Sequence, residues 1–271
     1  MSAGFDHEFV ASPTNSRIYR ATRRVHLGDV DGTGELRLEA LARYLQDIAT
    51  DDAHDGELAE QLGGAWVLRR MAVDIHAVPR FNEEVELATF CSGWGPAWAE
   101  RRTDVVAPDG SPLARAEAIW VFIDRANGRP LNLSDDFFRT YGAAAQGRRV
   151  SGRLRHRRPR PDASQRPWPL RESDFDVLDH VNNARYLEAV EDELAARLPK
   201  HRAIASEMEF RGQVERGDRV DLVTEVITGP VDGGHAEAEL SVWLVTDGQV
   251  RMSARVETRV THDAGRGLPL G

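Results

Sequence analysis

Cysteine is almost absent from this chain of 271 residues, which contains only Cys91. A single thiol cannot form an internal disulfide or a thiolate-based zinc cluster. Because Cys91 lies in a strand-like segment, we expect it to be buried and unreactive. The Gly- and Asp-rich turn at residues 28–34 has the composition of a calcium-binding loop but lacks ligands at the required spacing. We therefore expect no bound metal and no cofactor.

Long apolar segments are also missing, and so is an excess of positive charge. No apolar run approaches the roughly 20 residues that are needed to cross a bilayer. Residues 1–16 contain Asp6 and Glu8 and lack the apolar core of a secretory signal. The net charge of −9 argues against nucleic acid or an anionic membrane as a partner. These absences predict a cytoplasmic protein that binds neither membrane nor nucleic acid.

The remaining composition is that of an ordinary globular protein. Hydrophobic residues make up 41% of the chain and charged residues 29%, so there is enough apolar material for well-packed cores. A length of 271 residues fits two domains of roughly 115 residues each, with a linker between them. We therefore expect two domains rather than one.

The densest group of reactive side chains lies at residues 174–186, DFDVLDHVNNARY. This segment runs into a helical pattern, because apolar residues recur at three- and four-residue spacing from its last residue onward. Asn182 or Asn183 can cap the helix, since a short amide side chain accepts from the free N–H groups of the first turn. Asp176 and His180 lie four residues apart just before the cap. A carboxylate, an imidazole and two amides at a helix N-terminus indicate a site that stabilises a developing oxyanion.

The chain repeats one arrangement of elements at an offset of 145 residues. Residues 28–31 precede a predicted helix at 36–52, as residues 173–176 precede the helix that starts near Asn183. Runs of β-branched and aromatic residues predict several strands after each helix, and Asp-Gly turns join the last two strands of each half. A short helix capped by Ser134 ends the first half. The predicted strands lie at 16–27, 66–78, 85–91, 97–106 and 113–123, and then at 204–214, 220–227, 235–245 and 249–260.

The motif at 174–186 resembles the signature of acyl-ACP thioesterases, which end fatty acid synthesis by hydrolysing acyl carrier protein thioesters. The resemblance runs from about residue 25 to about residue 260, with further blocks at 66–71 (WVLRRM) and 208–211 (MEFR). These enzymes belong to the hot-dog superfamily, in which a curved antiparallel sheet wraps around a long helix.

The resemblance implies an α+β fold of two tandem hot-dog domains. A single sheet of this kind leaves one edge open, and isolated hot-dog domains cover it by dimerising. Both copies lie in one chain here, so we predict an intrachain pseudo-dimer with one continuous antiparallel sheet, present as a monomer or as a homodimer. The expected boundaries are 14–134 for the N-terminal domain, 135–164 for the linker and 165–262 for the C-terminal domain.

The same resemblance implies hydrolysis of a fatty acyl thioester of acyl carrier protein or coenzyme A. Asp176 falls on the catalytic aspartate of the superfamily, and His180 on the active-site histidine of the family. Leu178 stands where the family usually has Asn, and Gln213 and Val214 stand where it has Glu and often Cys. Gln213 can hold a water or the carbonyl but cannot act as a base near neutral pH. The reaction is therefore expected to depend on Asp176, as nucleophile or as base, and on His180.

Family resemblance also places the acyl chain in the N-terminal domain. The residues expected to line or close its tunnel are Trp66, Leu68, Met71 and Val73. A bulky side chain such as Trp66 would shorten the accepted acyl chain. Trp and Met within a strand also serve as ordinary core residues, and both interpretations stay open.

Arginine is concentrated between the two domains, in residues 146–160. The arginines are Arg148, Arg149, Arg153, Arg155, Arg157, Arg158 and Arg160. Prolines at 159, 161, 167 and 169 are expected to keep the later part of this region from regular structure. One interpretation is a solvated linker. The other is a docking strip that includes Arg155, Arg157 and Arg158 and binds the acidic acyl carrier protein or the phosphates of coenzyme A.

The first copy of the motif is expected to be inactive. It keeps Asp31, but Glu35 stands where His180 aligns, and Leu38 where Asn183 aligns. A carboxylate without these polar partners is better explained as a residue that starts the helix. We therefore predict one active site per chain.

Two other functions are compatible with parts of the pattern. Hot-dog hydratases that act on 2-enoyl thioesters place Asp and His five residues apart, typically with Asn-Pro between them. The separation here is four residues without Pro, which disfavours hydration. A non-catalytic acyl-thioester sensor is compatible with Leu178 and Gln213, although no helix-turn-helix pattern lies outside the two copies.

Overall fold

The computed structural model describes residues 9–57, 64–229 and 237–261 of the chain. Three sequence-based expectations reach beyond these residues. They concern the N-terminal segment up to residue 8, the first two residues of the strand predicted at 235–245, and residue 262 at the end of the second domain. None of the described helices is long and apolar enough to span a membrane.

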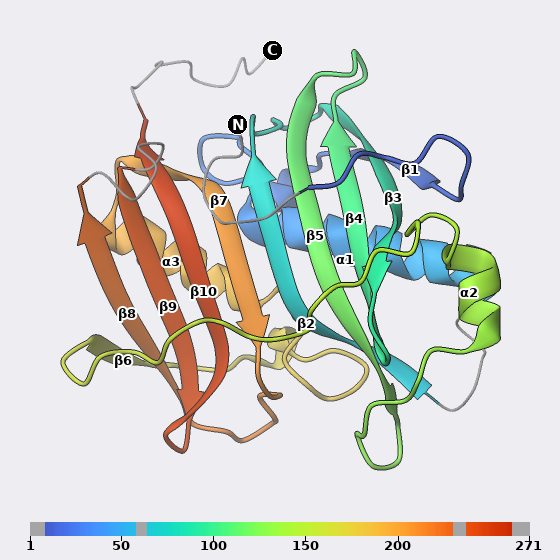
Figure 1. The fold of residues 1–271 in the computed structure, drawn as a ribbon. Helices are drawn as coiled ribbons and strands as arrows, with labels where there is room; N and C mark the ends of the chain where they lie inside the picture. The colour runs from blue at the N-terminus through green and yellow to red at the C-terminus, as the bar shows by residue number, and fades with distance from the viewer. Residues whose placement is uncertain (1–8, 58–63, 230–236, 262–271) are drawn as a thin grey trace.

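The described strands form one antiparallel sheet of ten, in the order β1-β3-β4-β5-β2-β7-β10-β9-β8-β6 (Figure 1). The first half contributes β1 (Tyr19–Arg24), β2 (Gly64–Ile75), β3 (Glu84–Trp94), β4 (Trp98–Val106) and β5 (Pro112–Asp124). The second half contributes β6 (Ser164–Trp168), β7 (His201–Phe210), β8 (Val220–Thr228), β9 (Ala238–Thr246) and β10 (Gln249–Val260). The two halves meet where β2 pairs with β7, so the sheet is continuous across the domain boundary.

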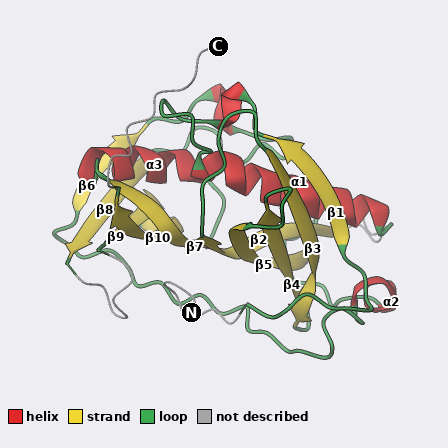
Figure 2. Ribbon diagram, turned by 90° about the horizontal axis from the view of Figure 1, so that it is seen from above, coloured by secondary structure: helices red, strands yellow, loops and turns green. Residues whose placement is uncertain are grey.

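Two helices, α1 (Leu38–Asp55) and α3 (Tyr186–Arg197), lie on the same face of the sheet, which curves around them (Figure 2). The helix predicted at 36–52 is present as α1, and of the apolar residues Leu38, Leu41, Leu45 and Ile48 on one of its faces, Leu38 is half-buried and the other three are buried. Each helix therefore covers the apolar face of a sheet that is too small to bury that face alone. The short helix α2 (Asp135–Tyr141) begins after Ser134, whose hydroxyl accepts from the Phe137 amide, as predicted.

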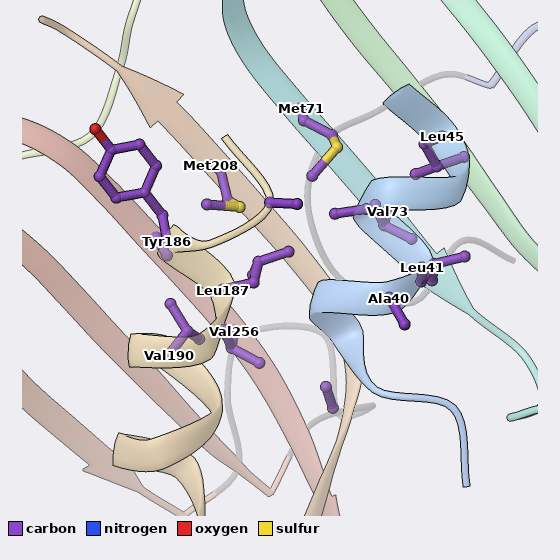
Figure 3. Packing of buried hydrophobic residues seen from close by; sticks show 14 of the residues in the cluster. Ala40, Leu41, Leu45, Met71, Val73, Tyr186, Leu187, Val190, Met208 and Val256 are labelled. Carbon is purple, nitrogen blue, oxygen red and sulfur yellow. The ribbon is translucent and has the colours of Figure 1, made fainter. Parts of the chain in front are cut away.

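The core lies between the helices and the centre of the sheet. Met71 of β2 and Met208 of β7 are direct partners across the junction, and both are buried. Figure 3 shows Met71 and Leu45 on the α1 side of this core, and Met208 and Leu187 on the α3 side. Because this layer is shared, truncating either methionine to Ala should destabilise both halves by about 2–5 kcal/mol. The expected fold, an intrachain pseudo-dimer of two hot-dog units, is confirmed.

The structure corrects three details of the sequence-based prediction. Residues 164–168 form the edge strand β6, although Pro167 argued against regular structure there; an edge strand tolerates proline because one side needs no ladder hydrogen bond. The strand predicted at 204–214 ends at Phe210, so Gln213 lies in the following loop. The helix predicted from Asn183 begins at Tyr186, after three residues of turn.

The arginine-rich linker crosses the face of the sheet opposite the helices (Figures 1 and 2). Its backbone is held by side chains of the sheet. The indole N–H groups of Trp98 and Trp243 donate to the carbonyls of Val150 and Arg157, each at 3.0 Å. The buried Glu209 carboxylate accepts from the backbone amide of His156 at 3.1 Å. Backbone anchoring explains why this segment follows a fixed path without being a helix or strand.

Candidate active site

Each long helix is preceded by a loop of the same backbone design. The first helix-start loop comprises residues 27–38 and the second comprises residues 172–183, and equivalent residues are 145 positions apart. The Asp31 amide donates to the Glu35 carbonyl, and the Asp176 amide donates to the His180 carbonyl, both at 2.9 Å. Each loop begins with a 3₁₀ turn, at Leu27–Asp29 and Glu172–Asp174. The repeat inferred from the sequence therefore corresponds to the same backbone hydrogen bond in both loops.

A fully buried carboxylate, Asp174, holds the second helix-start loop in place. It accepts from the Arg171 amide at 2.7 Å and from the Arg171 Nε at 3.1 Å. Its carbonyl accepts from the Asn182 amide at 2.9 Å, which ties the two ends of the loop together. The sequence motif contained Asp174, but its anchoring role was not predicted. This residue fixes the positions of Asp176 and His180, which lie between the two tied ends.

Asp176 is half-buried on a tight turn. Its Oδ1 accepts from the Leu178 amide at 2.9 Å, and Asp179 closes the turn with a φ of 60°. Within the described residues, neither the Asp176 Oδ2 nor the His180 ring has a hydrogen-bond partner. Burial raises the pKa of the Tyr186 phenol, and the negative charge of Asp176 raises it further. The carboxylate therefore lies near the buried first residue of α3.

The turn before α3 leaves the Asn183 backbone amide open. The predicted asparagine cap is wrong, because the residue that precedes the helix is Arg185, which forms no side-chain cap bond. The Asn182 Oδ1 instead accepts from the Ala184 amide at 2.9 Å within the turn. Among the described residues, the Asn183 amide N–H has no hydrogen-bond acceptor. An unsatisfied donor at the positive end of a helix is a suitable partner for an anionic oxygen.

A cavity of about 20 Å³ connects this helix start to the N-terminal half. It is lined by Asn183 and Ala184 from the second half, and by side chains of α1, β2, β4 and β5 from the first. Leu68 and Met71, two of the residues expected to bind the acyl chain, are part of the lining. The full lining is Ala42, Leu45, Gln46, Leu68, Met71, Arg101, Thr103, Ala116, Ala118, Trp120, Asn183 and Ala184.

The other two expected lining residues lie elsewhere. Trp66 packs in an aromatic cluster, with ring centroids 5.1 Å from Phe122 and 5.8 Å from Phe137. Val73 is buried in the main core. The sequence did not identify Gln46 or Arg101 as lining residues, because no local pattern indicates that they face residue 183.

Two family models cover most of the chain. Residues 16–141 match the acyl-ACP thioesterase N-terminal domain, and residues 158–260 match the acyl-ACP thioesterase C-terminal domain. The chain belongs to the acyl-ACP thioesterase family. Membership in this family supports thioesterase activity.

Similar proteins come from bacteria and plants. An uncharacterised protein of Mycobacterium tuberculosis is 25% identical over 221 residues, which are 80% of this chain and 86% of that protein. Oleoyl-acyl carrier protein thioesterase 1 of the Arabidopsis thaliana chloroplast is 25% identical over 228 residues, 74% of this chain and 61% of that protein. A Lactobacillus plantarum structure described as an oleoyl thioesterase has a TM-score of 0.79 and 24% identity, covering 92% of this chain and 98% of that one. This structural likeness shows the shared fold.

The positions where this member departs from the family pattern lie beside the second helix-start loop. The Val214 carbonyl accepts from the Val181 amide at 3.1 Å, and Val214 is fully buried. Gln213 is exposed, one residue before it. The single thiol of the chain lies elsewhere, in β3, where burial raises the pKa of Cys91 to about 11. A thiol that stays protonated at neutral pH is a poor nucleophile.

The arginines of the linker lie on the face of the sheet opposite the helices (Figure 2). Arg157 and Arg160 form ion pairs with Glu225, and the Arg149 guanidinium lies 3.3 Å from the ring centroid of Trp94. Arg155 and Arg158 are exposed and form no side-chain ion pair within the described part of the chain. Several of these arginines thus hold the linker against the sheet.

One cluster on this outer face has the residue types of a metal site: His156, Glu207 and Glu209 lie within ligand distance of one another. The oxygens of Glu209 are already engaged by linker amides and by Arg211, whose Nη2 donates to Oε2 at 2.6 Å. A guanidinium at this distance opposes a cation on the same oxygen. The cluster is explained by anchoring of the linker.

Proposed function

We propose that this protein hydrolyses fatty acyl thioesters of acyl carrier protein or coenzyme A, releasing the free acid and the carrier thiol. The observation that carries the proposal is that Asn183 lines one small cavity, with room for about one water molecule, together with the apolar residues Leu68 and Met71 of the other half. A thioester with an acyl tail needs both features, a donor for its carbonyl oxygen and an apolar surface for its chain. The domain at 14–134 would hold the chain, and the domain at 165–262 would supply the reactive groups.

In the first step an oxygen nucleophile adds to the thioester carbonyl carbon. The π electron pair moves to the carbonyl oxygen, where the Asn183 amide and the N-terminus of α3 stabilise the negative charge. The nucleophile is either the Asp176 carboxylate, which gives an anhydride that water then hydrolyses, or a water that Asp176 deprotonates. Its half-buried position with one committed oxygen supports either role.

In the second step the C–S bond breaks and the thiolate leaves. His180 precedes the turn before α3 and has an uncommitted ring within the described residues, which suits it to orient the water or to protonate the leaving sulfur. Asn182 would maintain this turn through its bond to the Ala184 amide. Gln213 would bind a water or the carrier arm at the exposed edge of the site, since an amide both donates and accepts.

Acyl carrier protein and coenzyme A both fit the proposal as carriers of the acyl group. Both acyl carrier protein and coenzyme A present phosphate, which arginine binds through charge-assisted hydrogen bonds. Arg155 and Arg158 are exposed and keep their charge available, whereas Arg157 is paired with Glu225. A carrier that uses this strip would have to reach from the outer face of the sheet to the rim of the second helix-start loop.

The direct test measures free thiol released from matched acyl-ACP and acyl-CoA substrates with a thiol reagent. The wild-type protein should release thiol and fatty acid in equal amounts, and an Asp176→Asn variant prepared in parallel should not. Equal rates from the two proteins would refute the assignment of Asp176. Tight binding of the acyl thioester without any thiol release by wild type would instead identify a sensor.

A further inference from the structure

The two long helices exchange contacts at their starts. α1 packs against α3, and the polar residues Gln46 on α1 and Glu191 on α3 stand at equivalent positions, 145 residues apart. Glu191 reaches the start of α1, where its Oε1 accepts from the Leu38 amide at 2.6 Å. Leu38 is the equivalent of Asn183. Because the two halves repeat the same arrangement, Gln46 is expected to face the start of α3. Gln46 and Asn183 do line the same cavity.

The carboxylate of Glu191 closes the start of α1 to another anion. It occupies the amide N–H of Leu38, which corresponds to the open amide of Asn183. A cleft of about 930 Å³ lies beside it, lined by Leu38, Glu39 and Glu191. This cleft is much larger than the cavity at Asn183, yet an oxyanion placed in it at Leu38 would meet a resident negative charge. Size therefore does not identify the reactive site.

Gln46 has the opposite character. Its side-chain amide is neutral, and it has no hydrogen-bond partner within the described residues. Its NH₂ group can donate two hydrogen bonds. Asn183 and Gln46 both line this cavity, so a thioester carbonyl oxygen bound in it at the Asn183 amide would lie beside Gln46.

We propose that Gln46 is a further residue of the active site, which donates to the thioester carbonyl oxygen together with the Asn183 amide. The neutral Gln46 faces the start of α3, whereas its acidic equivalent Glu191 faces the start of α1. This difference between the halves confines hydrolysis to the start of α3. This inference rests on the proposed thioesterase function and assigns a contact from the opposite domain to it. It also explains why both halves are needed for one site: the reactive groups come from one half, and the acyl lining and the second donor from the other.

The test is a Gln46→Glu variant, which places at the start of α3 the carboxylate that Glu191 places at the start of α1. At pH 8 its kcat should fall about 100-fold, because the variant loses the donor and also places a negative charge beside the developing oxyanion, while KM changes little. As the pH falls, the new carboxyl group becomes protonated and neutral, so the ratio of variant to wild-type kcat should rise again. A Gln46→Ala variant should lose about 10-fold in kcat with a ratio that does not depend on pH.

The charged groups near residue 46 determine the pH at which the Gln46→Glu variant regains activity. Arg101 on β4 lines the cavity with Gln46, and Asp176 and His180 precede Asn183 on the second loop. Glu191, whose charged neighbours are Glu39 and Arg37, has its pKa raised to about 7 by burial. Arg101 favours ionisation of the new carboxyl group, but its Nη1 is paired with the buried Asp52 at 2.6 Å, so the variant should recover as the pH falls through about 7.

A Glu191→Gln variant serves as the matched control and should hydrolyse substrate as fast as wild type. The inference is overturned if Gln46→Glu matches wild type at pH 8, or if its loss is the same at every pH, which would indicate a structural effect only. Circular dichroism at each pH separates misfolding from a local effect. An inactive wild type would instead refute the proposed function itself, so the two failures are distinguishable.

Discussion

The two helix-start loops share a backbone and differ in their side chains. Both contain the same short 3₁₀ turn, the same buried aspartate at its end and the same carbonyl-to-amide bond across the loop. In the first loop the Asp31 Oδ1 accepts from the Thr33 amide, the Thr33 hydroxyl and the Glu35 amide, at 2.8, 2.6 and 3.1 Å. In the second loop the Asp176 Oδ1 accepts from one amide. A scaffold that positions a carboxylate is therefore not sufficient for a site, because the carboxylate must also remain free to react.

The amides at the two helix starts differ in the same way. The Leu38 amide is occupied by Glu191, whereas the Asn183 amide is open within the described residues. The repeat thus keeps the hydrogen-bonded loop in both halves, and the groups proposed to react are left open in the second half. Paired substitutions at equivalent positions can separate the role of the loop from that of these groups.

The largest expected difference is between Asp176→Asn and Asp31→Asn. The first substitution should lower kcat by about 10⁴-fold, because the side chain loses both its nucleophilic and its basic character. The second should leave kcat within a factor of about two, since Asp31 is engaged in its own turn and lies outside the proposed site. Steady-state thiol release, with thermal unfolding as the folding control, checks both. Similar losses in the two variants would contradict a single active site.

Substitution of the buried aspartates Asp29 and Asp174 should lower stability to a similar extent, because each holds its helix-start loop in place. Asp174→Asn leaves Arg171 with a weakened buried partner, and Asp29→Asn does the same to Arg43, whose Nη2 lies 2.7 Å from the Asp29 carboxylate. Because the side chains of both arginines are more than a third exposed, each substitution should lower the free energy of unfolding by about 2–3 kcal/mol, from the lost hydrogen bonds of the buried carboxylate. Urea denaturation measures both, and Ser173→Ala, an exposed neighbour of Asp174, is the control. A loss confined to one loop would show that the two loops are not structurally equivalent.

His180 and Glu35 provide the next comparison. His180→Ala should reduce kcat about 100-fold, within the usual range for general acid–base groups. Glu35→Ala should leave kcat unchanged, because Glu35 pairs with Arg80 at 2.8 Å on the other loop. Steady-state thiol release measures both variants, and a wild-type kcat in the His180 variant would remove His180 from the mechanism.

The smallest expected effect concerns stability and pH. Burial raises the pKa of Glu191 from its ordinary value of 4.5 to about 7. The folded state therefore holds a proton that the unfolded state releases between these values, so stability falls as the pH rises through this window. Glu191→Gln removes the ionisation and should stabilise the protein by about 2 kcal/mol at pH 8 and very little at pH 4.5. Denaturation at both pH values checks the sign, and a stabilisation that does not depend on pH would contradict it.

Sequence patterns predicted the parts of this molecule that depend on neighbours in the chain. The structure contains the helix predicted at 36–52, as α1, and the 145-residue repeat, whereas the predicted asparagine cap of α3 is absent because Arg185 precedes that helix. Pro167 misled the prediction of β6, because only the sheet order shows that this strand lies at an edge. Periodicity alone could not predict such a position.

The site was predicted less completely than the fold. The motif contains Asp176, His180 and Asn183, which lie close together in sequence. Gln46 lies 137 residues before Asn183, and only the packing of α1 on α3 brings them to one cavity. The arginines of the linker suggested docking by composition, whereas the structure shows Arg157 engaged with Glu225. Contacts between domains decide these roles, and a local pattern does not encode them.

The most direct measurement is a crystal structure of the protein with a non-hydrolysable acyl analogue in which a methylene replaces the thioester sulfur. We expect one analogue per chain, with its carbonyl oxygen within hydrogen-bond distance of the Asn183 amide and its acyl tail against Leu68 and Met71. A carbonyl bound instead at the Leu38 amide, in the cleft beside Glu191, would contradict the account.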